Sequence, residues 1–286
     1  NEVINVCNGD VPPPFNNVDS VSGGSGNYGY IWQSSVDYGL NWTSATGIND
    51  SISYVPLTSH LDTTFYRRVV IDQSCGHSAY SNIIEVRVPD TLKAVTMPNA
   101  VSCNGLADGS LVTTVSGGFA PFSYLWSNGD TTSTLSGLSA STYTLTLTDD
   151  NGCTAISSTI ITEPAALIAT ITLDSNDIGN GGGATGSATG GTTAYTYTWS
   201  NGATTASITG ASAGTYSITI TDQNGCTDSA SVLITAGPLT SIILDSNVSC
   251  NGLIDGGATA SAVGGTTPYT YTWSNAATTA SITGVV

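Results

Sequence analysis

Cysteines are the most informative of the chemically active residues in this chain of 286 residues. Cys7 and Cys75 bracket one segment of the sequence, and Cys103 and Cys153 bracket the next. We predict that each pair forms a disulfide, which indicates an oxidising, extracellular compartment. A bridge that closes a loop of ~50 residues contributes roughly 4 kcal/mol in the chain-entropy treatment.

The remaining two cysteines lack an evident partner in their own segments. Cys226 follows an Asn-Gly pair, as Cys153 does, but its segment has no cysteine where the preceding one has Cys103. Cys250 has the same surroundings as Cys103, and its partner would lie beyond Val286. We therefore expect Cys226 and Cys250 to be unpaired or paired with each other.

The sequence offers no catalytic centre. Its two histidines, His60 and His77, lie early in the chain, and no lysine or arginine follows Lys93. A Ser-His-Asp or Cys-His nucleophile system cannot be assembled after that point. A phosphate loop, a dinucleotide fingerprint and a Cys/His cluster with metal spacing are also absent from the sequence. We predict that the chain is not an enzyme and binds no cofactor, with structural calcium as the one candidate ligand.

Several aspartates stand in the "NGLADG" and "NGLIDG" stretches or beside Asn-Gly pairs. Because no cation is available nearby, an oxygen-ligated Ca²⁺ ion would relieve their charge. The alternative, which we favour, is turn formation through hydrogen bonds to neighbouring backbone N–H groups. The candidate ligands are Asp108, Asp149, Asp150, Asp222 and Asp255.

These residues recur because the chain is built from repeats. "YLWSNGDTTSTLSGLSASTYTLTLTDDNGC" (124–153) aligns without a gap with "YTWSNGATTASITGASAGTYSITITDQNGC" (197–226), and "YTWSNAATTASITGVV" (271–286) begins a third copy. The period of about 74 residues suits a small domain in a tandem array. We predict a first domain over 1–90, repeat 1 over 91–164, repeat 2 over 165–238 and repeat 3 over 239–286, the last without its final strands.

Each repeat shows the alternation of a β-strand. Tyr197 and Trp199 face one way while Thr196 and Thr198 face the other. Asn-Gly pairs favour hairpin turns. Six or seven such strands per copy predict an all-β fold, a tandem array of small antiparallel immunoglobulin-like β-sandwiches. The predicted core tryptophans are Trp32, Trp126, Trp199 and Trp273.

The first domain is a more distant relative of the repeats. Its "TFYRRVVIDQSCG" (64–76) echoes "STYTLTLTDDNGC" (141–153), and "YGYIWQSS" (28–35) supplies a tryptophan on an alternating strand. We interpret it as an immunoglobulin-like sandwich. For Trp42 we favour packing, with carbohydrate stacking as the alternative.

The charge balance excludes several classes of partner. Four Lys and Arg stand against 20 Asp and Glu, for a net charge of −16. Nucleic acid and anionic membrane surfaces require clustered basic residues, so neither is expected as a partner. The sequence also lacks an apolar run long enough to span a bilayer, so we expect no membrane insertion.

The stretch "CNGLADGS…GG…PFSYLWSNGDTTSTLSGLSASTYTLTLTDDNGCTA…TEP" resembles the SprB repeat of giant cell-surface proteins of gliding Bacteroidota, over roughly 100–286. The first domain resembles the immunoglobulin-like modules that accompany such repeats. The resemblance implies export by type IX secretion and a role as an adhesin or appendage shaft. Asp-Ser/Thr patterns resemble the O-glycosylation sequon of exported Bacteroidota proteins. These stand at Ser20, Ser51, Thr63, Thr91, Thr131 and Ser229.

Together these observations predict a non-enzymatic extracellular protein, a rod-like structural and adhesive segment of a large cell-surface adhesin. Its partners would be surface glycans or proteins, or copies of itself. One alternative is a subunit of an assembled extracellular filament or hook for attachment or prey capture. Another is a carbohydrate-binding accessory region of a secreted hydrolase.

Overall fold

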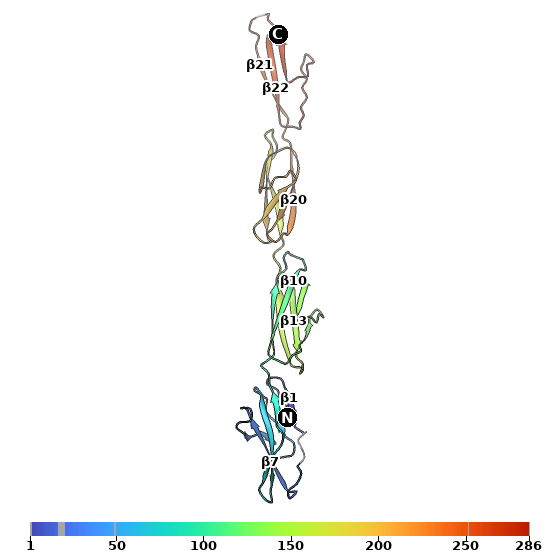
Figure 1. Ribbon diagram of the computed structural model, residues 1–286. Helices are drawn as coiled ribbons and strands as arrows, with labels where there is room; N and C mark the ends of the chain where they lie inside the picture. Colours follow the sequence, from blue (N-terminus) through green and yellow to red (C-terminus); the bar gives the residue numbers. More distant parts are fainter. Residues whose placement is uncertain (1, 17–20, 49, 251, 286) are drawn as a thin grey trace. The chain divides into compact units, whose positions relative to one another are not determined.

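The computed structural model describes residues 2–16, 21–48, 50–250 and 252–285, and its regular elements are all β-strands (Figure 1). This confirms the predicted all-β class of small antiparallel sheets in tandem. The described residues contain no helix that is long and apolar enough to cross a membrane. The chain divides into two compact units, residues 1–100 with 107–162, and residues 101–106 with 163–286.

The first domain is built around one sheet. Its strand order is β1-β8-β6-β2-β3, with β7 paired to β6 and a separate β4–β5 hairpin. The pairing of β1 with β8 is parallel, and the other pairings are antiparallel. The strands are β1 (Glu2–Asn5), β2 (Tyr28–Ser35), β3 (Thr43–Ser44), β4 (Gly47–Ile48), β5 (Val55–Pro56), β6 (Thr64–Asp72), β7 (Ser78–Tyr80) and β8 (Ile84–Arg87).

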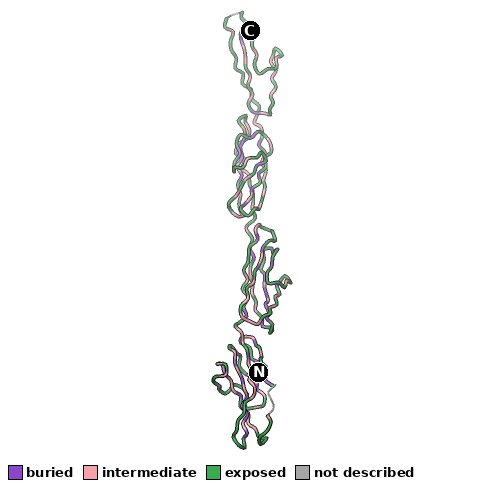
Figure 2. The backbone as a smooth tube through the Cα atoms, viewed as in Figure 1, coloured by how far each residue is buried: buried purple, intermediate pink, exposed green. Residues whose placement is uncertain are grey.

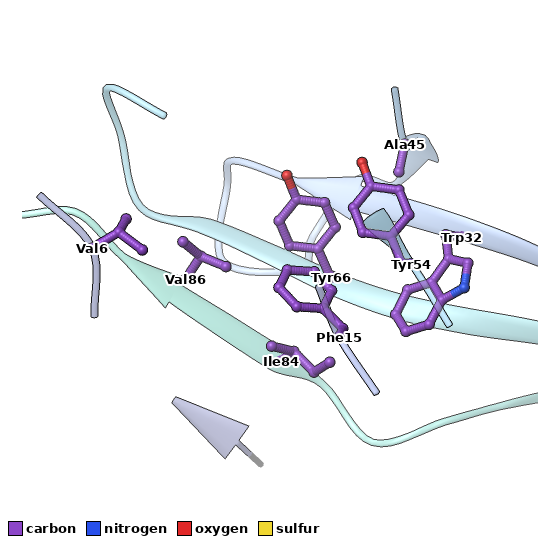
Figure 3. Close-up of a cluster of buried hydrophobic side chains, with 8 residues drawn as sticks. All are labelled: Val6, Phe15, Trp32, Ala45, Tyr54, Tyr66, Ile84 and Val86. Carbon is purple, nitrogen blue, oxygen red and sulfur yellow. The ribbon is translucent and has the colours of Figure 1, made fainter. Parts of the chain in front are cut away.

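Aromatic rings fill the core of the first domain (Figure 3). Phe15 lies 5.1 Å from Tyr66, 5.4 Å from Tyr54 and 6.0 Å from Trp32, measured between ring centroids. Trp32, one of the predicted core tryptophans, is fully buried, and its indole N–H donates to the carbonyl oxygen of Ser51 at 3.0 Å. The buried ring therefore leaves no polar atom unpaired, as a core tryptophan requires.

Repeats 1 and 2 share one topology of two three-stranded sheets. The sheet orders are β12-β10-β9 and β11-β13-β14 in repeat 1, and β15-β16-β18 and β17-β19-β20 in repeat 2. Repeat 1 contains β9 (Lys93–Asn99), β10 (Gly109–Ser116), β11 (Ser123–Trp126), β12 (Thr134–Leu138), β13 (Ser141–Thr148) and β14 (Thr154–Ile161). Repeat 2 contains β15 (Ile168–Ser175), β16 (Gly182–Thr189), β17 (Thr196–Trp199), β18 (Ser207–Ala211), β19 (Gly214–Thr221) and β20 (Thr227–Ile234).

The tryptophan of the repeated "WSNG" phrase lies in the core of both repeats. Trp126 and Trp199 are each 2% exposed, and each indole N–H donates at 2.9 Å to the carbonyl oxygen of a threonine six residues later. In repeat 2 the ring packs with Ile218 and Ile220, which alternate along β19 with outward-facing polar residues. The apolar face of the alternating strand thus becomes the core.

Repeat 3 is described as a single sheet, in the order β21-β22-β23. Its strands are β21 (Thr240–Ser246), β22 (Gly256–Val263) and β23 (Ser281–Val285). The tryptophan keeps its local hydrogen bond, from Trp273 to the carbonyl oxygen of Thr279 at 2.7 Å. The sheet that contains Trp199, β17-β19-β20, has no counterpart among the described residues of repeat 3, and Trp273 is only partly buried. Figure 2 shows few buried residues in this segment.

A Gly-Gly loop in each repeat binds the backbone at the boundary with the preceding domain. In repeat 2, Gly190 has φ of 72°, and the N–H of Gly191 donates to the carbonyl oxygen of Ala165 at 2.8 Å. Equivalent hydrogen bonds run from the N–H of Gly118 to the carbonyl oxygen of Asp90 and from the N–H of Gly265 to that of Gly237. A β-carbon at Gly190 would lie 2.0 Å from the carbonyl oxygen of Ala166. The first glycine is therefore required both for its conformation and for close backbone contact.

Gly190→Ala should destabilise repeat 2 more than Gly202→Ala does. Both glycines have positive φ, which costs an alanine about 1–2 kcal/mol, but a β-carbon at Gly202 would have nothing within 4 Å. The difference between the variants isolates the clash with Ala166. It can be measured by urea unfolding, read out by hydrogen-exchange pulse labelling of β15 and β16. Equal decreases in unfolding free energy in the two variants would show that the close contact between Gly190 and Ala166 contributes little to stability.

Candidate functional site

Aspartate side chains stabilise the two hairpins that contain Cys153 and Cys226, by accepting hydrogen bonds from backbone N–H groups. One oxygen of Asp149 accepts the N–H groups of Asn151 at 3.0 Å and Cys153 at 2.8 Å. The other accepts the N–H of Phe119, which follows the Gly-Gly pair of repeat 1, at 2.9 Å. The side chain therefore fixes the β13–β14 hairpin and ties it to the Gly-Gly loop.

Repeat 2 contains the same arrangement. One oxygen of Asp222 accepts the N–H groups of Asn224 and Cys226, both at 2.9 Å, and the other accepts that of Thr192 at 2.8 Å. Asp149 and Asp222 are each 5% exposed. These two aspartates form turns, as the interpretation that we favoured for them requires.

The first domain has an equivalent aspartate that sequence reasoning missed. Asp72 accepts the N–H of Ser74 at 2.9 Å with one oxygen and that of Ser25 at 2.8 Å with the other. Ser25 follows Gly23 and Gly24 as Phe119 follows its Gly-Gly pair, and Cys75 lies in this hairpin. The recurring "GG" of 23–24, 117–118 and 190–191, each paired with a later aspartate, was the available signal.

These hydrogen bonds favour the ionised carboxylates. The pKa of Asp222 is lowered from 3.8, mainly by the backbone hydrogen bond from Thr192. The pKa of Asp72 is held well below its usual range, chiefly by the hydroxyl of Ser25. Donors that bind the charged form lower a carboxyl pKa.

We expect repeat 2 to lose stability in acid. Because the native pKa of Asp222 lies below the unfolded value, its contribution is fully present above about pH 4 and declines as pH falls through the native pKa. The unfolding free energy of repeat 2, measured in urea at pH 5 and at pH 3, should fall at the lower value. Asp222→Asn, which removes the titrating group, should reduce this pH dependence. If Asp222→Asn leaves the pH dependence of the unfolding free energy unchanged, titration of Asp222 is not linked to folding.

The disulfides differ from the predicted pairs. Cys7 is bridged to Cys153 with a Cα–Cα distance of 5.6 Å, and Cys103 is bridged to Cys226 at 5.7 Å. The predicted pairs Cys7–Cys75 and Cys103–Cys153 are therefore wrong, and so is the expectation that Cys226 lacks a partner other than Cys250. Two exposed free cysteines remain among the described residues, Cys75 and Cys250.

The predicted pairing in repeat 1 fails because its two cysteines lie at opposite ends of the strands. A β-carbon on Gly109, which begins β10, would lie 2.9 Å from Ile161, so the β9–β10 loop with Cys103 lies at the Ile161 end of β14. Cys153 precedes the other end of that strand. Eight strand residues separate the two ends by roughly 25 Å, whereas a disulfide needs Cα atoms within about 7 Å.

The same argument holds for the first domain. The N–H of Val6 donates to Arg87, and Val86 pairs with Thr64, so Cys7 lies near the start of β6. Cys75 follows the end of that strand. The cysteines thus form two classes. Loop cysteines precede Asn-Gly (Cys7, Cys103 and Cys250), and hairpin cysteines lie in aspartate-held hairpins (Cys75, Cys153 and Cys226).

The asparagine after a loop cysteine binds the proline that leads into the next domain. The amide of Asn8 donates to the carbonyl oxygens of Pro89 at 3.4 Å and Leu61 at 3.2 Å. That of Asn104 donates to Pro164 at 3.1 Å. The motif thus supplies a covalent bond through its cysteine and a hydrogen bond to the linker through its asparagine.

Repeat 2 has no loop cysteine, and the side chain of Asp177 stabilises the corresponding loop instead. One oxygen of Asp177 accepts the N–H groups of Gly179 at 2.9 Å and Gly181 at 3.0 Å, and the other accepts that of Ala213 at 3.3 Å. The backbone of Asp177 bridges in parallel to Ala236. A cavity of about 300 Å³ lies beside it, lined on the repeat 3 side by Gly265, Thr266, Thr267 and Tyr269.

The candidate calcium ligands do not form a cluster among the described residues. No group of three or more His, Cys, Asp or Glu side chains in the described part of the chain is placed to hold a metal ion. Asp255 accepts the N–H of Ser249 at 3.0 Å, Asp150 donates its N–H to Phe119, and Asp108 also makes a contact. Calcium binding stays a prediction.

The candidate glycosylation sites differ in exposure. Thr91, Thr131 and Ser229 are exposed, and Ser51 and Thr63 are partly buried. Ser20 lies outside the described residues. Glycosylation likewise stays a prediction, and the three exposed positions are the accessible ones.

Three segments of the chain match two family models. Residues 98–131 and 246–278 match the SprB repeat, and residues 2–90 match DUF8696, a domain of unknown function. Neither description names a catalytic activity. No curated protein matches the chain.

Similar solved structures include tandem-domain adhesion proteins. The eight N-terminal Ig domains of Down Syndrome Cell Adhesion Molecule align at TM-score 0.35 and 12% identity, over 91% of this chain and 44% of that one, so this chain spans less than half of its length. A tetra-tandem repeat from the extending region of a large adhesion protein aligns at TM-score 0.31 and 17% identity, over 91% and 84%.

Proposed function

We propose that this chain is a non-enzymatic structural segment of an extracellular surface adhesin, in which disulfides join the first domain to repeat 1 and repeat 1 to repeat 2. The observation that carries the proposal is the recurrent bridge from a loop cysteine of one domain to the hairpin cysteine of the following domain. A fold that needs its bridges only for local stability would place them inside each sandwich. These bridges instead resist separation of successive domains. The two SprB repeat matches support a cell-surface location.

The buried histidine of the first domain makes structural contacts. His60 is buried, with Nδ1 3.1 Å from the carbonyl oxygen of Thr58 and Nε2 in contact with the hydroxyl of Tyr66. Burial lowers the pKa of its imidazole. The Tyr66 ring, whose centroid lies 5.7 Å from that of His60 and 5.1 Å from that of Phe15, places this pair against the aromatic core.

The carbohydrate-binding alternative depends on Trp42, which is half-buried. The guanidinium of Arg67 lies 4.1 Å from the centroid of this ring and 4.3 Å from that of Tyr80. The indole N–H of Trp42 donates to Gly39 at 2.9 Å. One ring face is thus covered by the cation and the polar edge is already bonded. These contacts support packing, and we propose no sugar site there.

The proposal is tested on cells that produce the protein. Antibodies against the chain should label intact, unpermeabilised cells, and antibody bound in advance should reduce attachment of those cells to surfaces. Labelling only after permeabilisation would contradict a surface location. Polysaccharide hydrolysis by the purified chain would contradict a non-enzymatic role. An antibody against a cytoplasmic protein serves as the control for cell integrity.

A further inference from the structure

The loop between β2 and β3 exposes three apolar side chains close together. Val36, Tyr38 and Leu40 are 73%, 84% and 81% exposed. Single exposed apolar side chains are normal on a soluble protein, whereas a cluster of them marks an interaction surface. This loop is therefore a candidate contact surface of the first domain.

Hydrogen bonds hold the loop in one conformation. The hydroxyl of Ser35 donates to one oxygen of Asp37 at 2.7 Å and accepts the N–H of Gly39 at 2.9 Å. The same oxygen of Asp37 accepts the N–H of Asn41 at 2.9 Å, and the other accepts the amide of Asn41 at 2.6 Å. Because the loop is already ordered, it loses little conformational entropy when it binds a partner.

Tyr38 has a backbone conformation that favours asparagine or glycine. Its φ is 61°, and Gly39 follows with a φ of 82°. These are the central residues of a turn in which the N–H of Leu40 donates to the carbonyl oxygen of Asp37 at 3.3 Å. Asn, Asp and Gly are favoured where both central φ values are positive, and a tyrosine there is strained. Its ring contacts that of Phe65 at 5.5 Å but stays exposed to solvent, so burial does not offset the strain. Strain at an exposed residue points to a function of its side chain.

A groove of about 410 Å³ adjoins this loop, at the end of the first domain that leads into repeat 1. Val36, Tyr38 and the exposed Leu61 give it apolar walls, and the exposed Asp62 and Asp90 supply carboxylates. We call it the Tyr38 groove. Its lining residues all lie between 36 and 90, so the groove is complete within the first domain and its linker.

The basic residues of the first domain do not neutralise these carboxylates. Arg87 pairs with Glu85 at 2.7 Å. Arg67 is enclosed by two aromatic rings, and Arg68 is buried. Within the described part of the chain, neither carboxylate of the Tyr38 groove forms an ion pair. An incoming ammonium or guanidinium group therefore meets uncompensated negative charge beside an apolar wall.

We propose that the Tyr38 groove binds an exposed segment of another protein, in which an apolar side chain stands beside lysine or arginine. The apolar side chain packs on Tyr38 and Leu61, and the basic one binds Asp62 or Asp90. A second copy of this chain is a poor occupant, because it carries a net charge of −16. The inference goes beyond the structural role proposed above and does not depend on it.

Selection of a displayed random peptide library on the immobilised full chain tests this proposal. The selected peptides should be enriched in lysine or arginine next to large apolar residues, and the strongest binder becomes the probe in fluorescence polarisation. Its affinity should fall as NaCl rises from about 0.05 M to about 0.5 M, because salt screens exposed charges. Selection of no peptide, selection of peptides without basic residues, or binding that salt leaves unchanged would overturn the proposal.

Tyr38→Asn separates binding from folding. It should weaken binding of the selected peptide by about tenfold or more. Because asparagine suits this turn, the urea midpoint of the first domain, read from pulse labelling of β2 and β6, should stay the same or rise. Ile156→Thr, which removes an exposed apolar side chain from β14 of repeat 1, is the control and should bind normally.

Two further measurements test the charge and the class of partner. Asp62→Asn and Asp90→Asn together should weaken peptide binding at about 0.05 M NaCl and change it little at about 0.5 M. A glycan array probed with the full chain should show no glycan whose binding is lost in Tyr38→Asn. Such a glycan would assign the groove to a sugar and overturn the proposal. Unchanged peptide binding by Tyr38→Asn would overturn it too, and so would a lowered midpoint, which would show that the tyrosine serves the fold.

Discussion

Trp199→Ala is expected to lower the unfolding free energy of repeat 2 by about 3–5 kcal/mol. The ring is 2% exposed and packs against Ile218, Ile220 and Ile234 from both β19 and β20. Its removal leaves a cavity that two thin sheets cannot fill, and it frees the carbonyl oxygen of Thr205 that accepts the indole N–H at 2.9 Å. The measurement is urea unfolding with hydrogen-exchange pulse labelling, which resolves each repeat.

Trp273→Ala is the matched control. It removes the same side chain from the same "WSN" phrase, with the equivalent hydrogen bond to Thr279, but from a partly buried position. Its effect on repeat 3 should be much smaller than that of Trp199→Ala on repeat 2. Similar decreases in unfolding free energy in the two variants would mean that the tryptophan stabilises the local turn and contributes little through packing in the core.

Loss of the Cys103–Cys226 bridge should destabilise repeat 2 by roughly 4 kcal/mol. When repeat 2 unfolds with the bridge intact, the segment from the linker to Cys226 stays tied to Cys103, and closing a loop of ~60 residues removes about this much chain-entropy stabilisation from the unfolded state. The variant carries Cys103→Ser and Cys226→Ser together, so no free thiol is left. Repeat-resolved pulse labelling in urea measures the change.

Two comparisons make this result specific. The described strands of repeat 3 carry no bridge, so labelling of β21 and β22 should not change in the double variant. Dithiothreitol should destabilise repeat 2 of the unaltered chain but not of the double variant. A reductant effect of equal size in both would show that it arises elsewhere, for example at Cys7–Cys153.

Period-two alternation was sufficient to predict the strands, because one apolar face per strand has only one way to be buried. The alternation around Trp199 placed its ring in the core, and the Asn-Gly pairs at 151–152 and 224–225 predicted the β13–β14 and β19–β20 hairpins. Trp273 lies in the same sequence phrase as Trp199 but is only partly buried. Burial of this tryptophan therefore depends on strands outside the phrase, which the local alternation does not predict.

The cysteine pairing could not be obtained from proximity in the sequence. Spacing shows which cysteines share a domain, but it does not show at which end of the strands each one lies. One signal was available. Repeat 2 keeps its hairpin cysteine, Cys226, although it lacks a loop cysteine. A partner in the preceding repeat, Cys103, explains that retention, whereas pairing within a domain leaves it without a reason.

The spans of the two bridges overlap along the sequence, from 7 to 153 and from 103 to 226. A protease that cuts the backbone once at any bond between Cys7 and Cys226 therefore leaves two fragments that are still covalently joined. Between Cys103 and Cys153 both bridges span the cut. The oxidised chain tolerates backbone damage over most of its length, and the protection ends after Cys226, where a single cut releases the remainder.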